Sequence, residues 1–242
     1  RITRIFAFLV ALCLCGATHA WWARGHLVMD EAAVRALPDD VPAFFRQGGE
    51  TIKSYANDPD LYRDRALPAL RNAGAPEHFF DVELLKGNSP PERRGDFFVL
   101  CNKLHIHPYS VGLLPYAILE NCQKLTYAFA EYRHAPENEA VRAKILYIAG
   151  ILSHYTGDAT QPLHCTVHYD GRTNPDGSSP RTGIHAKVDA LPGRLGMKPA
   201  DIAPKRVARI ENVFARAMEV IRESNGKVDA VYDMEDRLPE AE

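Results

Sequence analysis

The segment 138–160 restricts the fold of this chain more than any other part of the sequence. It reads N-E-A-V-R-A-K-I-L-Y-I-A-G-I-L-S-H-Y-T-G-D-A-T and predicts one long helix, apolar nearly all round from Ile145 to Leu152. Such a helix is buried on every side, so other helices must surround it. Its last turns carry His154 and Asp158, which are four residues apart and therefore project from one face. We expect these two side chains to converge on one ion.

Helical spacing of apolar residues recurs along most of the chain. The other segments with this pattern are 27–37, 41–47, 50–57, 111–133, 183–191 and 203–224. We expect D-P-D at 58–60 to break the third of these helices, Ser110 to cap the fourth, and Pro115 to lie near its first turn. Strand signals are scarce, and F-F-V-L at 97–100 is the best of them. The sequence therefore predicts an all-α fold, a single compact domain of several helices.

The longest connection runs from about Thr166 to Thr182. It is rich in Gly, Pro, Asn, Asp and Ser and lies between two candidate metal ligands, His164 and His185. Long loops of this kind are commonly functional lids or insertions.

The first twenty residues have the pattern of a secretory signal peptide. Arg1 and Arg4 precede an apolar run from Ile5 to about Leu14, with small residues ahead of Ala20. Cleavage there would leave residues 21–242 as one domain, secreted or periplasmic, with 27 basic residues against 31 acidic ones. A broad basic footprint for duplex nucleic acid is therefore absent from the sequence. We expect a monomer without stable membrane insertion.

Three cysteines follow the signal segment, in a compartment that permits disulfides. Spacing favours a bridge between Cys101 and Cys122, which leaves Cys165 unpaired.

Residues with metal-ligating chemistry recur along the chain. Pro162 cannot continue the helix after Asp158, so His164 comes off the turn just beyond it. Imidazole and carboxylate together suit zinc, and the two oxygens of Asp158 could bridge two ions. Further candidates are His26, Asp58 or Asp60, His78, His185 with Asp189 four residues on, and the α-amine and carbonyl of Trp21 once the signal is removed.

These motifs, in this order and at this rough spacing, resemble one α-helical superfamily. Its members are the zinc-dependent phospholipases C and the secreted single-strand-specific 3′-nucleotidase/nucleases. The matching motifs are W-x4-H at Trp21–His26, H-F-x-D at His78–Asp81, H-x3-D-x2-Q-P-L-H at His154–His164 and H-x3-D at His185–Asp189. The resemblance covers most of residues 21–242 and implies long loops around a cleft that holds three zinc ions.

Carried over position by position, the resemblance implies three ligand sets. The first zinc would take Asp60 or Asp58, His78, His154 and Asp158; the second His164, His185 and Asp189; the third Trp21, His26 and the other oxygen of Asp158. Y-A-N-D ending at Asp58 looks like the phospholipases, whereas Asp60 followed three residues later by Arg63 matches the nucleases. We prefer Asp60, in which case Arg63 corresponds to the arginine that grips the scissile phosphate.

The resemblance also implies the chemistry and limits the substrates. A zinc-activated hydroxide would attack a phosphodiester, with Asp60 or Asp58 orienting the nucleophile or accepting its proton. Phe79 and Asp81 match the nuclease positions that stack a base and hold its edge. We therefore favour single-stranded nucleic acid or 3′-nucleotides as substrate, with phospholipid as the alternative. Arg24 stands where a choline pocket would need an acid.

The chain stops 53 residues after Asp189, which is shorter than expected of the nucleases. We expect part of the pocket wall to be reduced or to lie outside this sequence.

Overall fold

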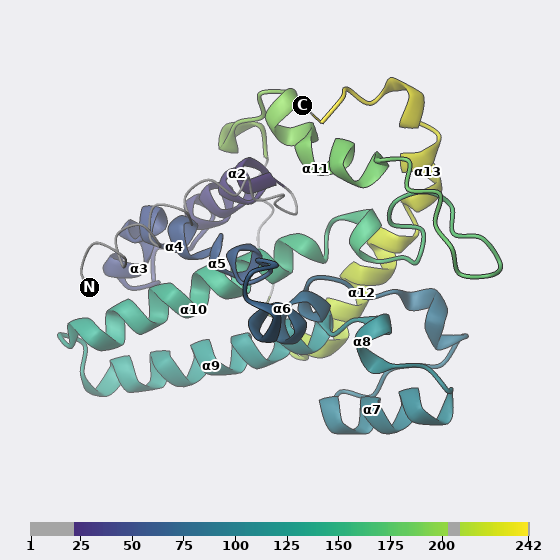
Figure 1. The fold of residues 1–242 in the computed structure, drawn as a ribbon. Helices are drawn as coiled ribbons and strands as arrows, with labels where there is room; N and C mark the ends of the chain where they lie inside the picture. The colour runs from purple at the N-terminus through teal and green to yellow at the C-terminus, as the bar shows by residue number, and fades with distance from the viewer. Residues whose placement is uncertain (1–21, 203–208, 242) are drawn as a thin grey trace, which may run out of the picture.

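The computed structural model describes residues 22–202 and 209–241. Within them the chain is helical, without any strand, and its elements pack into a compact body (Figure 1). The α-helices are α2 (Trp22–Arg35), α3 (Ala43–Gln47), α4 (Gly49–Tyr55), α5 (Asp58–Leu61), α6 (Pro68–Gly74), α7 (Arg94–Lys103), α8 (Pro108–Val111), α9 (Leu114–His134), α10 (Glu139–Asp158), α11 (Ile184–Arg194), α12 (Val213–Asn225) and α13 (Val228–Tyr232). Short 3-10 turns are η2 (Ala75–His78), η3 (Val82–Leu85), η4 (Pro162–His164), η5 (Pro199–Asp201) and η6 (Glu235–Arg237).

Helix α10 is the centre of the molecule, as its apolar sequence predicts. It packs along α9 and also contacts α2, α3, α4 and α5 (Figure 1). The side chain of Asn138 caps its first turn by accepting hydrogen bonds from the backbone N–H groups of Ala140 and Val141. Ile145 is fully buried, and His154 and Asp158 at the far end are fully buried as well. The helix thus carries the polar pair into the interior.

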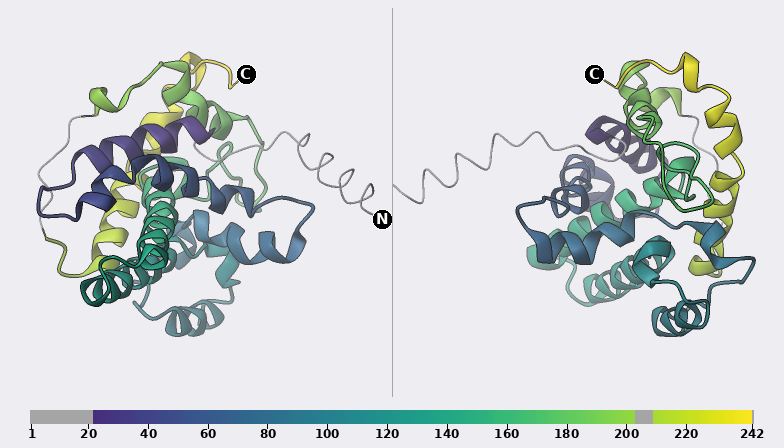
Figure 2. Two further views of the ribbon diagram at one scale, coloured as in Figure 1. Left: turned by 90° about the vertical axis from the view of Figure 1, so that its left-hand side faces the viewer. Right: turned by 45° about the vertical axis from the view of Figure 1, so that its right-hand side comes forward.

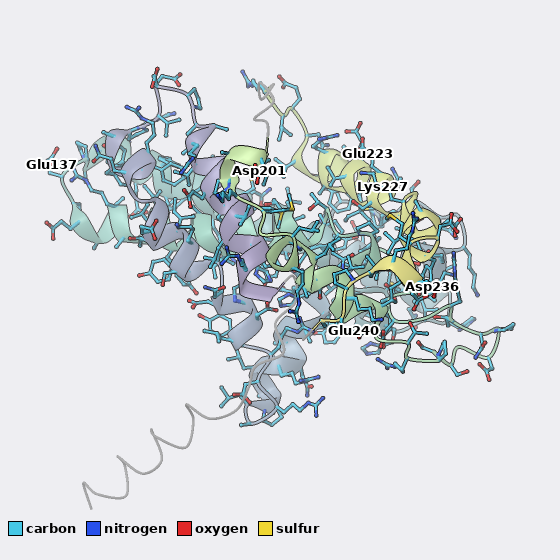
Figure 3. The ribbon with its side chains drawn as sticks, turned by 90° about the horizontal axis from the view of Figure 1, so that it is seen from above. Glu137, Asp201, Glu223, Lys227, Asp236 and Glu240 are labelled. Atoms are coloured by element: carbon cyan, nitrogen blue, oxygen red, sulfur yellow. The ribbon has the colours of Figure 1, made fainter. Side chains whose placement is uncertain are left out.

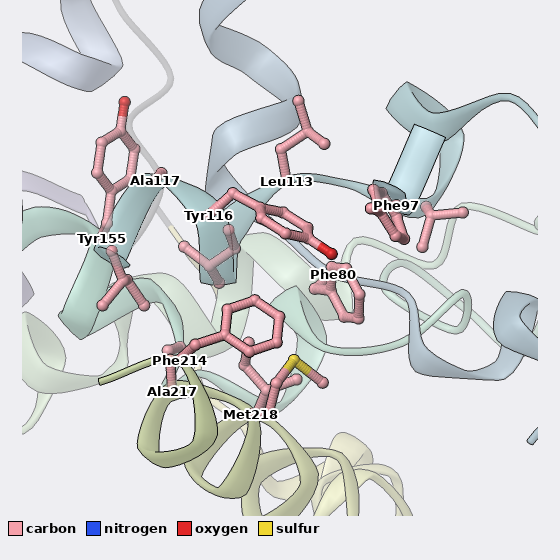
Figure 4. Packing of buried hydrophobic residues seen from close by; sticks show 14 of the residues in the cluster. Phe80, Phe97, Leu113, Tyr116, Ala117, Tyr155, Phe214, Ala217 and Met218 are labelled. Atoms are coloured by element: carbon pink, nitrogen blue, oxygen red, sulfur yellow. The ribbon is translucent and has the colours of Figure 1, made fainter. Parts of the chain in front are cut away.

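Two apolar clusters fix α10 in place. One joins Phe45 and Ile52, from α3 and α4, to Ile145. The other gathers aromatic side chains from α7, α9 and α12, with Tyr116 between Phe97 and Phe214 at ring-centroid distances of 5.0 and 5.2 Å (Figure 4). Burial of these large side chains contributes roughly 1.5–3 kcal/mol each and holds the helix ends that carry the polar residues.

Residues 97–100, the best strand signal in the sequence, lie in α7, in keeping with the predicted all-α fold. Phe97 and Cys101 are one helical turn apart and both fully buried, so helical spacing, not alternation, places the apolar side chains inside. The described residues also contain no strand with which F-F-V-L could pair.

The predicted cap of the long helix is wrong. Ser110 does not cap the long helix: it lies in α8, and Gly112, with φ of 94°, separates α8 from α9. A Cβ at Gly112 would collide with the carbonyl of Phe79, so only glycine fits there. The preceding helix α4 ends at Tyr55, before D-P-D, as expected, and D-P-D itself opens the short helix α5, because Pro59 is tolerated in a first turn. Pro115 lies in the first turn of α9, as expected.

The helix predicted over 203–224 is α12, and it is shorter than predicted. It begins at Val213, where Asn212 caps it, and residues 209–212 are not helical. Residues 203–208 of the predicted range, and the expected signal peptide, lie outside the described residues.

The favoured disulfide is also wrong. Cys101, Cys122 and Cys165 are all free thiols, and burial raises the pKa of each. Spacing in sequence does not fix the short Cα separation and side-chain orientation that a disulfide requires.

Charged side chains cover the outside of the fold. Glu137, Glu223 and Lys227 are exposed and project outward in Figure 3. Among the described residues, no helix combines the length and apolar content needed to span a bilayer. Among the described residues the buried acids are Asp30, Asp158 and Asp189, and the last two lie with buried histidines.

Candidate metal centre

The first group of potential ligands lies where α5, η2 and α10 meet. Nδ1 of His78 is 3.0 Å from Nε2 of His154 and 3.0 Å from Oδ2 of Asp158. Oδ1 of Asp60 lies 3.7 Å from His78 Nδ1 and 4.0 Å from His154 Nε2. Ligand atoms about 2.1 Å from a common tetrahedral ion are about 3.4 Å apart, so these separations suit a zinc-sized cation.

The two acids of α5 face different ways. The side chain of Asp60 is 5 % exposed and points to the two histidines. Asp58 instead accepts a hydrogen bond of 3.2 Å from the hydroxyl of Tyr62. The structure therefore brings Asp60, and not Asp58, together with the first group.

The second group consists of His164 from η4 with His185 and Asp189 from α11. His185 and Asp189 are one helical turn apart, with Nε2 3.1 Å from Oδ2. Nε2 of His164 faces them, 3.1 Å from Nε2 of His185 and 4.0 Å from Oδ1 of Asp189. Pro162 lies in the first turn of η4, and this turn redirects the chain so that His164 faces α11.

The third group joins His26 of α2 to the end of α10. Its Nε2 is 3.6 Å from Oδ1 of Asp158, and its ring stacks on that of His154 with centroids 4.1 Å apart. His154 thus belongs to this group as well as to the first. Trp21, expected here as a ligand, lies outside the described residues.

Asp158 connects the three groups. Its Oδ2 faces the first group, while its Oδ1 faces His26 and lies 3.1 Å from Nδ1 of His164. The carboxylate is completely buried, and it faces histidines from four elements, α2, η2, α10 and η4.

Backbone carbonyls fix the orientation of two of these rings. Nδ1 of His154 donates to the carbonyl of Ala56 at 2.8 Å, and Nδ1 of His164 donates to the carbonyl of His78 at 3.0 Å. A carbonyl can only accept, so Nδ1 carries the hydrogen and Nε2 keeps its lone pair toward the ligand groups.

Gln161 orients the carboxylate of Asp189 by a hydrogen bond. Its Nε2 donates to Oδ1 of Asp189 at 2.8 Å, and its Oε1 accepts from the backbone of Leu163. The residue is fully buried. Its place in the Q-P-L-H motif was the only sequence signal for this role.

Burial and neighbouring charges set the protonation of the site. Burial lowers the pKa of His26 to about 3 and that of His78 to about 4, so both rings are neutral, the form that binds metal. Burial would raise the pKa of Asp158, but His154 and His164 hold it well below its ordinary range. Burial would lower the pKa of both those histidines, but Asp158, together with Asp60 beside His154 and Asp189 beside His164, raises it above the ordinary value.

Several buried atoms of the site have no hydrogen-bond partner among the described residues. They are both ring nitrogens of His26, Nε2 of His78, Nδ1 of His185 and Oδ1 of Asp158. Unpartnered buried polar atoms are costly, about 1–3 kcal/mol each. Cations held by the three groups would satisfy Asp158 Oδ1 and a nitrogen of His26, so the donor set fits metal ions.

A pocket of about 320 Å³ opens over the first two groups. It is lined by Arg63, His78, Phe79, Asp81, Ser110, Leu163, His164, Tyr169 and His185. Arg63 donates to Oδ1 of Asp60 at 3.0 Å, and its side chain is 35 % exposed, so it can reach a ligand in the pocket. Burial raises the pKa of Asp81 well above its ordinary value.

Tyr169 and Ser110 are pocket residues that no sequence motif marked. Tyr169 lies in the long loop after His164 and packs edge-on against the ring of His185, with centroids 5.9 Å apart. The only signal for it was the expectation that this loop is functional.

Comparisons of this chain with protein-family models, with curated proteins and with solved structures find no match.

Proposed function

We propose that this chain is a zinc-dependent phosphodiester hydrolase that holds three zinc ions, of the phospholipase C/nuclease type. The observation that supports it best is the presence of three neighbouring His/Asp groups around the buried carboxylate of Asp158, two of which contribute side chains to one pocket. Imidazole and carboxylate ligands are those that zinc uses in catalytic sites. Asp60, His78, His154 and Asp158 would hold the first ion; His164, His185 and Asp189 the second; His26 and Asp158, with Trp21, the third.

Zinc bound there would supply Lewis acidity, which lowers the pKa of water and offsets charge on a phosphate. The side chains at the pocket do the rest. Arg63 is positioned to bind the equatorial oxygens of a phosphodiester and to stabilise the charge that accumulates on them. Asp60, held by Arg63, would accept the proton of the attacking water.

Single-stranded nucleic acid or a 3′-nucleotide is the favoured substrate. Phe79 and Tyr169 give the pocket two aromatic walls on which a base can stack. Asp81, whose raised pKa favours a protonated carboxyl, could both donate to and accept from a base edge. Phospholipid is the second candidate, because three exposed leucines lie close to Arg63 in the sequence: Leu61, Leu67 and Leu70.

The test is to count the zinc ions of the purified protein and to assay it in parallel on single-stranded DNA, RNA, a 3′-mononucleotide and phosphatidylcholine. We expect three ions and nucleotide products. An Asp158→Asn variant should lose zinc and turnover together, while Asp176→Asn, in an exposed loop, serves as the matched control. Release of phosphocholine without nucleotide products would reverse the order of the candidates, and full activity without zinc would refute the proposal.

A further inference from the structure

Residues 61–71, from the end of α5 into α6, form an exposed apolar segment. Leu61, Leu67 and Leu70 are 49, 48 and 41 % exposed, and every residue from Arg65 to Leu70 is exposed. In both views of Figure 2 the α5–α6 region lies at the outer edge of the molecule. Clustered large apolar side chains at a surface commonly mark a binding site.

The 61–71 segment is also cationic. It contains three arginines and one acid, Asp64, in a chain whose formal net charge is −2; Arg63 is paired with Asp60, so Arg65 and Arg71 supply the positive charge. Arg71 donates to the carbonyl of Arg63 at 3.0 Å, which ties the two ends of the segment together. Leucines between arginines are the arrangement that binds the surface of an anionic bilayer, where apolar side chains enter the headgroup region and cations meet lipid phosphates.

A second pocket, of about 300 Å³, lies behind the 61–71 segment. Its walls combine apolar side chains, among them Leu70, Ile148 and Ile151, with the charged side chains of Glu77 and Lys124. Leu70 thus connects the exposed leucines to the apolar part of this recess. Single-stranded nucleic acid would leave these leucines exposed to water, because its bases stack on aromatic side chains and not on leucines.

We infer that the 61–71 segment docks this protein on the surface of an anionic lipid bilayer. Leu67 and Leu70 enter the headgroup region, and Arg65 and Arg71 face lipid phosphates. Because Arg63 belongs to the segment and also lines the pocket over the metal centre, docking holds the pocket mouth close to the bilayer. The inference goes beyond the proposed function and holds whichever phosphodiester is cleaved.

Vesicle co-sedimentation tests the inference on the intact, zinc-loaded protein. We expect binding to phosphatidylcholine vesicles that contain phosphatidylglycerol, weak binding to phosphatidylcholine alone, and a decrease with added salt. The Leu67→Ser/Leu70→Ser variant should lose at least about tenfold in affinity, and Arg65→Gln about fivefold. Leu195→Ser is the matched control, since Leu195 is 64 % exposed on another part of the surface.

Turnover of bis(4-nitrophenyl) phosphate, measured alongside, separates docking from catalysis. It should be unchanged in all three variants, which also shows that they are folded. Equal vesicle binding by wild type and Leu67→Ser/Leu70→Ser, or an equal loss in Leu195→Ser, would overturn the inference. If Arg65→Gln weakens binding to single-stranded DNA but not to vesicles, the segment binds nucleic acid and not lipid, and the inference is overturned. Vesicle binding without turnover by the wild type would refute only the proposed function.

Discussion

Replacing His26 by Asn should make the metal-free protein less sensitive to acid. Burial lowers the pKa of His26 from 6.5 to about 3. Between these two values the unfolded chain binds a proton at this residue and the folded protein does not. The stability from the neutral ring is therefore fully present above pH 6.5 and is lost as the pH falls toward 3.

The size of the effect follows from the same two values. At about pH 5 the unfolded ring is almost fully protonated, and the folded protein loses about 2 kcal/mol relative to neutral pH from His26 alone. His78, with a pKa of about 4, adds a loss of similar sign that the variant keeps. His26→Asn should thus reduce the acid-induced loss of unfolding free energy by about 2 kcal/mol.

Urea denaturation in the presence of a chelator, at about pH 7.5 and about pH 5, measures this difference. His134→Asn is the control, because His134 is exposed at the end of α9 and its replacement should leave the loss unchanged. Nuclear magnetic resonance gives a second measurement on the wild type: the ring proton of His26 should not titrate between pH 8 and about pH 4. A normal titration of that ring, or equal acid sensitivity in wild type and His26→Asn, would refute the reasoning.

Three further predictions concern the metal centre and the pocket. Asp60→Asn should lower phosphodiester turnover by at least about a hundredfold, and Asp58→Asn by less than about threefold; the opposite order would assign the ligand to Asp58. Gln161→Leu frees the carboxylate of Asp189 and should weaken zinc binding about 10–100-fold by calorimetric titration; an unchanged affinity would show that the orienting hydrogen bond is dispensable. Phe79→Ala should raise KM for single-stranded DNA about tenfold with little change in kcat, because one stacking contact is lost. An equal effect on an abasic strand would argue against stacking.

Long periodic segments were predictable from the sequence, and short or irregular ones were not. The central helix, expected over 138–160, is α10 at Glu139–Asp158, because apolar periodicity and the cap at Asn138 both mark it. The segment 97–100 is a run of only four apolar residues, and such a short run fits a buried helix as well as a strand. Serine is a good capping residue, but Ser110 does not begin the long helix. That helix begins after Gly112, whose close approach to the Phe79 backbone only a glycine allows.

The same distinction between periodic and irregular segments holds for the residues of the candidate site. Pairs four residues apart on one helix, such as His185 and Asp189, could be placed together from spacing alone. Which acid of D-P-D faces the histidines depends on the direction in which α5 leaves the core, and no local pattern contains that information. Tyr169 reaches the pocket from an irregular loop, where side-chain direction follows no period.

The buried charges explain why the metal centre and the fold are expected to depend on each other. Asp158 and Asp189 lie in the core, and burial makes an uncompensated carboxylate there costly. His154 and His164 compensate Asp158, and this raises the pKa of rings that a metal would need neutral. Metal ions would favour the neutral rings and would satisfy the unpartnered oxygen of Asp158. A cluster assembled from α2, α5, α10 and α11 would then join the N-terminal and C-terminal halves of the fold through one shared carboxylate, so the energy that binds the ions would also hold the helices together.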